Sequence, residues 1–224
     1  MNVHNVLEEL DQLFQNKEIQ KVEVFLSEKL EEAMVEGDTN AVITLLNEMI
    51  GYYRDTSQYE SAITYCKQLL KLMDDINLVG SVPYATTLLN IANAYRAAGL
   101  LSDSLRLYMT VFDIYEDRLE NNDFAYASLY NNISLLYQEM KDYKKSCENL
   151  EKALAIVEQF PNARIEIATS HANLATSLLK LNKNKEAMDH IEIAFDLFQV
   201  DEVKDYHYSA ALSAMGEAQF KDGN

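Results

Sequence analysis

The chain has 224 residues, of which 48% are apolar, enough for a folded core and too many for a disordered segment. Its 6 Gly and 2 Pro are too few for a protein of many short strands, so the composition predicts an almost entirely helical chain. The net charge of −17 argues against nucleic acid and anionic membranes as partners. With two cysteines, no signal segment and no long apolar stretch, we expect a cytoplasmic protein.

The first predicted elements are two amphipathic helices before residue 40. Apolar residues recur at helical spacing in segments 3–14 and 19–33, and Gly37 is placed to end the second helix in the left-handed conformation. Residues 1–40 contain 10 acidic and 3 basic side chains, a net charge of −7. Terminal repeats of a stacked array need a polar outer face, so we expect this pair to be a degenerate N-terminal cap.

The remainder, 41–224, repeats itself. Small or medium-sized residues at the equivalent position of each copy are spaced 42, 42, 41 and 41 positions apart: Ile50, Ala92, Ser134, Ala175 and Gly216. Each period has two amphipathic helices joined by a short turn. The second helix repeats a small residue that allows close helix packing: Ala62, Ser104, Ser146 and Ala187. We therefore expect repeats at about 42–83, 84–125, 126–166 and 167–207, with a half repeat at 208–224.

One copy shows the motif of the repeat most clearly. Its first helix has Leu88, the pair Ile91-Ala92 and Tyr95, followed by Gly99 at the turn and Tyr108 in the second helix. This pattern resembles the tetratricopeptide repeat family over about residues 40–224. The period is longer than the common 34 residues, and in this respect the chain is similar to kinesin light chains and to many bacterial arrays. The resemblance implies an all-α fold, an α-α superhelix in which antiparallel helix pairs form a right-handed solenoid.

The resemblance also implies that the first helices of successive repeats line a concave groove. The position two residues before the small residue is Asn in three consecutive repeats: Asn90, Asn132 and Asn173. Asn is a mediocre helix former, and its amide can pair with both the N–H and the C=O of an extended peptide. Three further asparagines lie beside this position: Asn47, Asn93 and Asn131. The alternative interpretation is that these amides bond to neighbouring helices and stabilise the stack.

The charges near this predicted groove favour one kind of partner. Arg54 and Arg96 lie in the next turn and are placed to hold a carboxylate. The family's two-carboxylate clamp, however, needs Lys and Arg at several groove positions where this chain has Asn, Glu and small residues. We therefore expect a protein or an extended peptide that is neutral or basic rather than acidic.

The sequence has no recognisable catalytic pattern. No two of the four histidines are four residues apart, a spacing that would indicate a metal site on a helix: His4, His171, His190 and His207. The sequence also has no glycine-rich phosphate loop and no nucleophile elbow. Cys66 and Cys147 fall on positions that predict buried thiols. We expect neither an enzyme nor a cofactor nor a bound metal.

Three functional hypotheses follow. The first is a scaffold or adaptor that binds a protein or peptide in the groove. The second is the regulatory N-terminal part of a larger bacterial enzyme or signalling protein, cut after Asn224, because the fifth repeat lacks its second helix. The third is a peptide-sensing regulator without a DNA-binding domain, since residues 1–40 are acidic. An uncovered last helix around 212–220 would also allow a homodimer.

Overall fold

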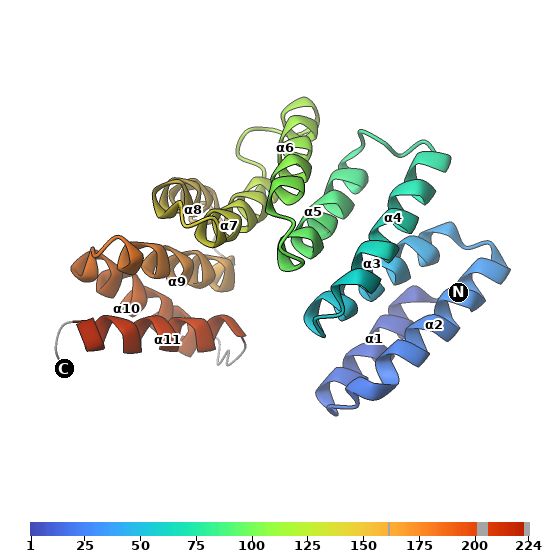
Figure 1. The fold of residues 1–224 in the computed structure, drawn as a ribbon, viewed down its shortest axis with the longest axis horizontal. Coiled ribbons are helices and arrows are strands. Elements are labelled where there is room, and N and C mark those ends of the chain that lie inside the picture. The colour runs from blue at the N-terminus through green and yellow to red at the C-terminus, as the bar shows by residue number, and fades with distance from the viewer. Residues whose placement is uncertain (161, 201–205, 222–224) are drawn as a thin grey trace. The chain divides into compact units, whose positions relative to one another are not determined.

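The computed structural model describes residues 1–160, 162–200 and 206–221, and all regular secondary structure within these ranges is α-helical (Figure 1). The helices are α1 (Val3–Gln15), α2 (Ile19–Glu36), α3 (Thr39–Asp55), α4 (Tyr59–Asp75), α5 (Val82–Ala97), α6 (Leu101–Arg118), α7 (Phe124–Glu139), α8 (Tyr143–Val157), α9 (Arg164–Lys180), α10 (Asn184–Val200) and α11 (Tyr206–Lys221). The expected all-α repeat fold is confirmed. None of the described helices is both long and apolar enough to cross a membrane.

The same turn joins the two helices of every complete pair. In each turn one residue adopts the left-handed conformation, with φ between 58° and 76°: Lys17, Ser57, Gly99, Lys141 and Asn182. The next backbone N–H bonds back to a carbonyl five residues earlier, as from Gln58 to Tyr53 and from Asp142 to Tyr137. This is the Schellman arrangement, which satisfies carbonyls at the end of a helix. Gly37 ends α2 in the same conformation, as the sequence predicts.

Small residues bring the two helices of a pair together. The four small residues that the repeat predicts are completely buried: Ala62, Ser104, Ser146 and Ala187. Ser104 Oγ donates to the backbone oxygen of Ala92 at 2.8 Å, so the hydroxyl is satisfied where α6 meets α5. A larger side chain here would force the helices apart.

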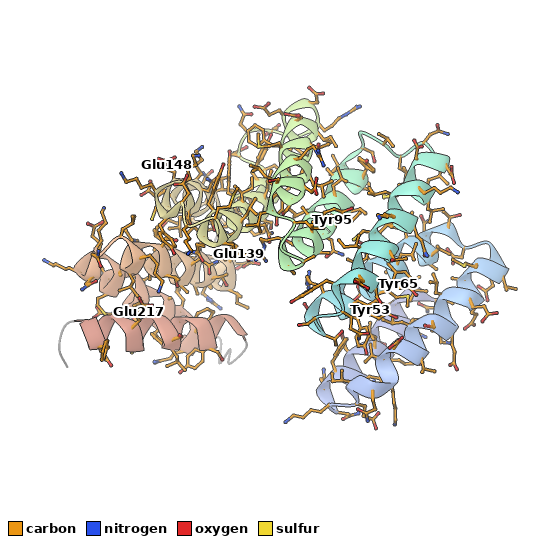
Figure 2. The ribbon with its side chains drawn as sticks, in the orientation of Figure 1. Tyr53, Tyr65, Tyr95, Glu139, Glu148 and Glu217 are labelled. Carbon is orange, nitrogen blue, oxygen red and sulfur yellow. The ribbon has the colours of Figure 1, made fainter. Side chains whose placement is uncertain are left out.

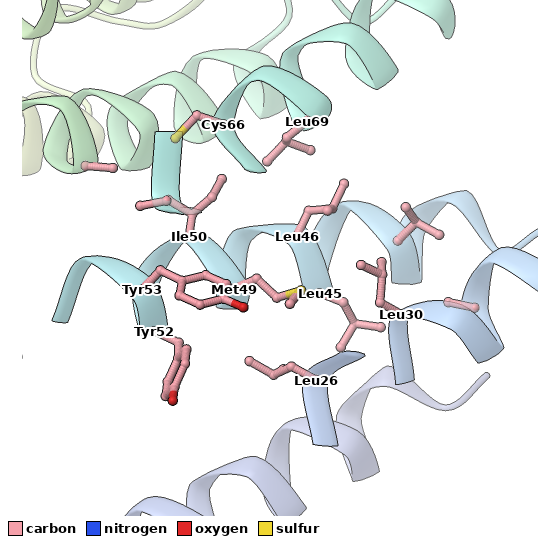
Figure 3. Packing of buried hydrophobic residues seen from close by; sticks show 14 of the residues in the cluster. Leu26, Leu30, Leu45, Leu46, Met49, Ile50, Tyr52, Tyr53, Cys66 and Leu69 are labelled. Carbon is pink, nitrogen blue, oxygen red and sulfur yellow. The ribbon is translucent and has the colours of Figure 1, made fainter. Parts of the chain in front are cut away.

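The chain divides into two compact units, Met1–Ile114 and Tyr115–Asn224, with the boundary inside α6. In the first unit α3 packs against α2, α4 and α5. Leu26, Leu45, Met49 and Leu69 are buried in its core (Figure 3). The predicted division at residue 40 into a cap and an array stays a prediction.

In the second unit α9 is the central helix. It packs against α7, α8, α10 and α11. The last helix, α11, buries Ala211, Ala214 and Ala218, while Leu212 and Phe220 are 47% and 82% exposed. One face of α11 therefore has large apolar side chains in contact with solvent.

Candidate functional site

Two first helices of the second unit, α7 and α9, form a pocket of about 310 Å³. We call it the α7–α9 pocket. Its lining residues come from α7, from α9 and from the last residue of α8: Phe124, Ala127, Ser128, Asn131, Asn132, Leu135, Ile165, Glu166, Thr169, Asn173 and Val157. Three of the eight predicted groove residues thus line a single pocket.

The sequence places this lining through a spacing of four on both helices. On α7, Asn132 is preceded four residues earlier by Ser128 and eight residues earlier by Phe124. On α9, the equivalent residues before Asn173 are Thr169 and Ile165. Residues four apart lie on one face of a helix. Each helix therefore presents an apolar residue, a hydroxyl and an amide in the same order, offset by one repeat.

The polar groups of the pocket differ in how they are satisfied. The Asn131 amide donates to Ser170 Oγ at 2.9 Å and so links α7 to α9. Asn132 donates to the Ser128 carbonyl of its own helix at 2.9 Å. Within the described part of the chain, the Asn173 side chain makes no hydrogen bond. Asn132 and Asn173 therefore keep hydrogen-bonding capacity for a ligand.

The backbone carbonyl of Asn173 is part of a hydrogen-bond network between helices. Gln138 Nε2 donates to the Asn173 carbonyl at 3.1 Å and to Ser177 Oγ at 2.9 Å. Ser177 Oγ lies 2.8 Å from Ser146 Oγ, and both serines are fully buried. This network fixes α9 against α7 and α8, so the free amide stands on a rigid support.

Charge in the α7–α9 pocket is negative. Among the described residues that line it, Glu166 is the one ionisable side chain, and it is exposed. Asp123 caps the start of α7 by accepting from the Ala125 N–H at 2.8 Å. The expected preference for a neutral or basic partner stays a prediction.

The other predicted groove residues lie in the first unit, where they join helices. Asn90 of α5 donates to Asn47 Oδ1 of α3 at 3.0 Å and accepts from Arg54 Nη1 at 3.4 Å. Asn93 accepts from the Tyr108 hydroxyl of α6 at 2.5 Å. These bonds fit the interpretation in which the amides stabilise the stack.

The two arginines were expected to hold a carboxylate. Arg54 does so within the chain, because its Nε donates to Asp55 Oδ1 at 2.8 Å. Arg96 is half-buried in the last turn of α5. Neither residue lines the α7–α9 pocket.

The first unit also has a pair of stacked tyrosines, one on α3 and one on α4. Tyr53 stacks on Tyr65 with ring centroids 5.3 Å apart, and its hydroxyl donates to Glu23 Oε1 at 3.0 Å (Figure 2). Burial, followed by the bond to Glu23, raises the pKa of Tyr53. The tyrosine is neutral at physiological pH and joins α2, α3 and α4.

Sequence spacing missed a histidine pair in the second unit. His171 of α9 and His190 of α10 approach with 2.7 Å between their Nδ1 atoms. Burial, together with the charge that His190 would have, lowers the pKa of His171 to about 4, and burial lowers that of His190. No group of three metal-ligating residues forms among the described residues. The two histidines are 19 residues apart, so only the packing of α9 on α10 brings them together.

The thiols are where the sequence places them. Cys66 and Cys147 are both buried and unpaired. Burial raises the pKa of Cys66 to about 12 and raises that of Cys147. Thiols with raised pKa values are poor nucleophiles at neutral pH.

Comparison with known proteins assigns the chain to a family. The family model of the tetratricopeptide repeat matches residues 41–117 and 125–199. The chain belongs to the tetratricopeptide repeat family. No curated protein sequence matches it. The resemblance to long repeats of the kinesin-light-chain type is also confirmed by solved structures.

Three such structures resemble this tetratricopeptide repeat protein. BtubC (BKLC) from P. vanneervenii has 17% identity and a TM-score of 0.74, covering 91% of this chain and 82% of its own. A putative kinesin light chain of Podosopora anserina with nearly identical TPR-like repeats has 16% identity and a TM-score of 0.67, covering 91% and 97%. PlcR of Bacillus thuringiensis, in complex with the peptide PapR7 and DNA, has 16% identity and a TM-score of 0.70, covering 95% and 73%. At these identities the likeness establishes the fold alone.

Proposed function

We propose that this tetratricopeptide repeat protein is a non-catalytic adaptor of the cytoplasm that binds an extended peptide, or an extended segment of another protein, in the α7–α9 pocket. One observation supports this function above the others. Asn132 and Asn173, which occupy the same position of consecutive repeats, line one pocket and retain free hydrogen-bonding capacity. An amide pair of this kind matches the alternating donors and acceptors of a peptide backbone.

The pocket favours a neutral or basic segment. Glu166 is the one ionisable residue among the described residues that line it, and the whole chain has a net charge of −17. An acidic ligand would meet repulsion both during its approach and in the pocket. The ligand's polar groups would instead bond to Asn132, Asn173 and the hydroxyls of Ser128 and Thr169.

Peptide sensing is the more specific form of this proposal. PlcR, whose fold this chain shares, was solved with the peptide PapR7. A peptide-responsive regulator without a DNA-binding part would need the same pocket and the same amides. We rank it second, because the α7–α9 pocket accommodates a segment of a larger protein equally well.

The test is a selection from a random heptapeptide library followed by fluorescence anisotropy. The double variant Asn132→Ala/Asn173→Ala should bind the selected peptides at least tenfold more weakly, since each lost amide bond to a backbone is worth about 1 kcal/mol. Asn149→Ala is the matched control. Asn149 also donates to a carbonyl of its own helix, at 2.7 Å, but lies on the second helix of the pair. Equal affinities for the wild type and the double variant would contradict the proposal.

We also propose that the exposed face of α11 supports self-association. Leu212 and Phe220 present large apolar side chains to solvent there. Burying such a patch between two copies would be favourable. Sedimentation should show a dimer that weakens when both residues are changed to Ser, and a strict monomer at high concentration would contradict this proposal.

A further inference from the structure

We infer that the segment bound by the α7–α9 pocket has a bulky apolar side chain with a cationic group beside it, located about four residues from the backbone stretch that pairs with Asn132 and Asn173. This inference rests on the proposed function and specifies its ligand. Its basis is the division of the pocket into an apolar end and an amide region.

The apolar end lies where α7 and α9 begin. Phe124 and Ile165 line it together with Val157, which is completely buried. Phe160 meets Phe124 edge to face with ring centroids 5.1 Å apart. Ile165 and Phe160 remain 41% and 37% exposed, so apolar surface is available at this end. A ligand side chain that covers this surface removes it from water, which favours Phe, Leu, Ile or Met over a small residue.

The cationic preference comes from the acids beside this end. Glu166 follows Ile165 directly and lines the pocket. Asp123 precedes Phe124 and caps α7. Arg164 is the nearest base in sequence, at the start of α9, but it does not line the pocket. A Lys or Arg side chain, or a free N-terminal amine, on the ligand would therefore pair with Glu166.

The separation between the two regions follows from helix geometry. Phe124 lies eight residues before Asn132, and Ile165 lies eight residues before Asn173. Eight residues of α-helix rise about 12 Å. An extended peptide covers this length in about four residues. Because both helices show the same order, a peptide lying along them meets the apolar end and the amides at this one spacing.

The experiment uses the whole chain and a positional peptide library. The probes are dye-labelled, N-terminally acetylated decapeptides. One position is Phe, Leu or Ser, and a neighbouring position is Lys, Gln or Glu. The number of residues between this pair and the randomised stretch varies from peptide to peptide. Peptides with Phe or Leu next to Lys should be enriched. Replacing the apolar residue by Ser should weaken binding about tenfold or more, since it removes a buried apolar side chain.

Two variants of the protein give the reciprocal test. Ile165→Ala should lose most of the preference for Phe or Leu over Ser. Glu166→Lys should reverse the preference from Lys to Glu in the peptide, a change in selectivity that a merely structural role would not produce. The matched controls are Ile193→Ala, at a site 42% exposed on α10, and Glu192→Lys on the same helix. Both controls should leave the selectivity unchanged.

The outcomes separate this inference from the proposed function. If no peptide binds, or if Asn132→Ala/Asn173→Ala binds as well as the wild type, the proposed function fails and the inference with it. If binding depends on the two asparagines but neither Ile165→Ala nor Glu166→Lys alters selectivity, the function stands and the inference is overturned. A second copy that occupies the pocket, seen as a dimer abolished by Ile165→Ala, would also overturn it. Non-acetylated peptides without Lys show whether an N-terminal amine supplies the cation: binding restored by the free amine supports the inference.

Discussion

The first helices of the two compact units share a polar pattern but use it differently. On α5 the pattern is Val82, Thr86 and Asn90, and α7 and α9 repeat its apolar, hydroxyl and amide order. Asn90 bonds to Asn47 and Arg54 of the preceding first helix, so its amide holds the stack together. Among the described residues, Asn173 has hydrogen-bond partners only for its backbone oxygen.

The difference originates in the neighbouring helix rather than in the pattern itself. In the first unit α3 supplies Asn47, whose carbonyl and side-chain oxygens both lie within reach of Asn90. In the second unit Asn131 and Ser170 form the link between α7 and α9, which leaves Asn132 and Asn173 available. Identical residues therefore join helices in one unit and keep hydrogen-bonding capacity in the other.

The largest expected effect is a loss of stability in the first unit that leaves the second unit folded. Leu45→Ala creates a cavity in the first unit, where Leu45 is completely buried, and should cost about 2–5 kcal/mol. Hydrogen exchange should then show loss of protection in α2, α3 and α4 while α9 and α10 stay protected, because stability in stacked arrays depends on neighbouring elements. Val35→Ala, at a site 83% exposed on α2, is the control. Equal loss of protection in both units would show that they unfold as one.

The buried histidine pair makes the stability of the second unit depend on pH in the acidic range. The pKa of His171 is lowered to about 4 in the folded state from its usual 6.5. The unfolded chain therefore binds protons first as the pH falls, so stability is fully present above pH 6.5 and is lost between pH 6.5 and 4. Asp189, Glu186 and Glu151 oppose this effect at His190.

The measurement is the melting temperature of the protein between pH 4 and pH 6.5. In His171→Gln/His190→Gln the decrease on acidification should be smaller by several degrees, because the two titrating groups are gone and amides can still bond to each other. His4→Gln is the control, since His4 is exposed. Parallel pH profiles for the wild type and the double variant would contradict the prediction.

A smaller effect tests the two roles of the amides directly. Asn90→Ala should lower the free energy of unfolding by about 1–2 kcal/mol, because it removes bonds to Asn47 and Arg54. Asn173→Ala should change it by less than about 0.5 kcal/mol, as expected for a side chain without a structural partner. Urea unfolding of both variants measures the difference. Equal destabilisation by the two substitutions would remove the distinction between the units.

The smallest effect concerns the turns, which are alike in both units. Lys141 and Ser57 adopt φ values of 60° that glycine adopts without strain. Lys141→Gly and Ser57→Gly should each stabilise the chain by about 1 kcal/mol. Gly99→Ala should destabilise it by a similar amount, because Gly99 has a φ of 76° that strains a residue with a Cβ. The added Cβ would meet no neighbour, so backbone strain is the whole of the expected cost. Urea midpoints check all three, and a destabilising Lys141→Gly would contradict the prediction.

The sequence alone determined the helical repeat, its period and its turns. A period of 41–42 residues with small residues such as Ser104 and Ser146 specifies helix pairs, because only small side chains allow their close approach. Gly37 and Gly99 marked two helix ends, and helical spacing correctly placed Cys66 in the core. These features depend on local conformation and on burial, both of which a single helix pattern encodes.

Only the tertiary structure decided what each polar residue does. Asn90 and Asn173 hold the same position in the repeat, and the neighbouring helix alone determines that one is bonded and the other free. His171 and His190 meet, and Phe124 and Ile165 line one pocket, because separate helices pack side by side. Hydrogen bonds and pockets between helices depend on distances between residues about 40 positions apart, which periodicity within one helix does not specify.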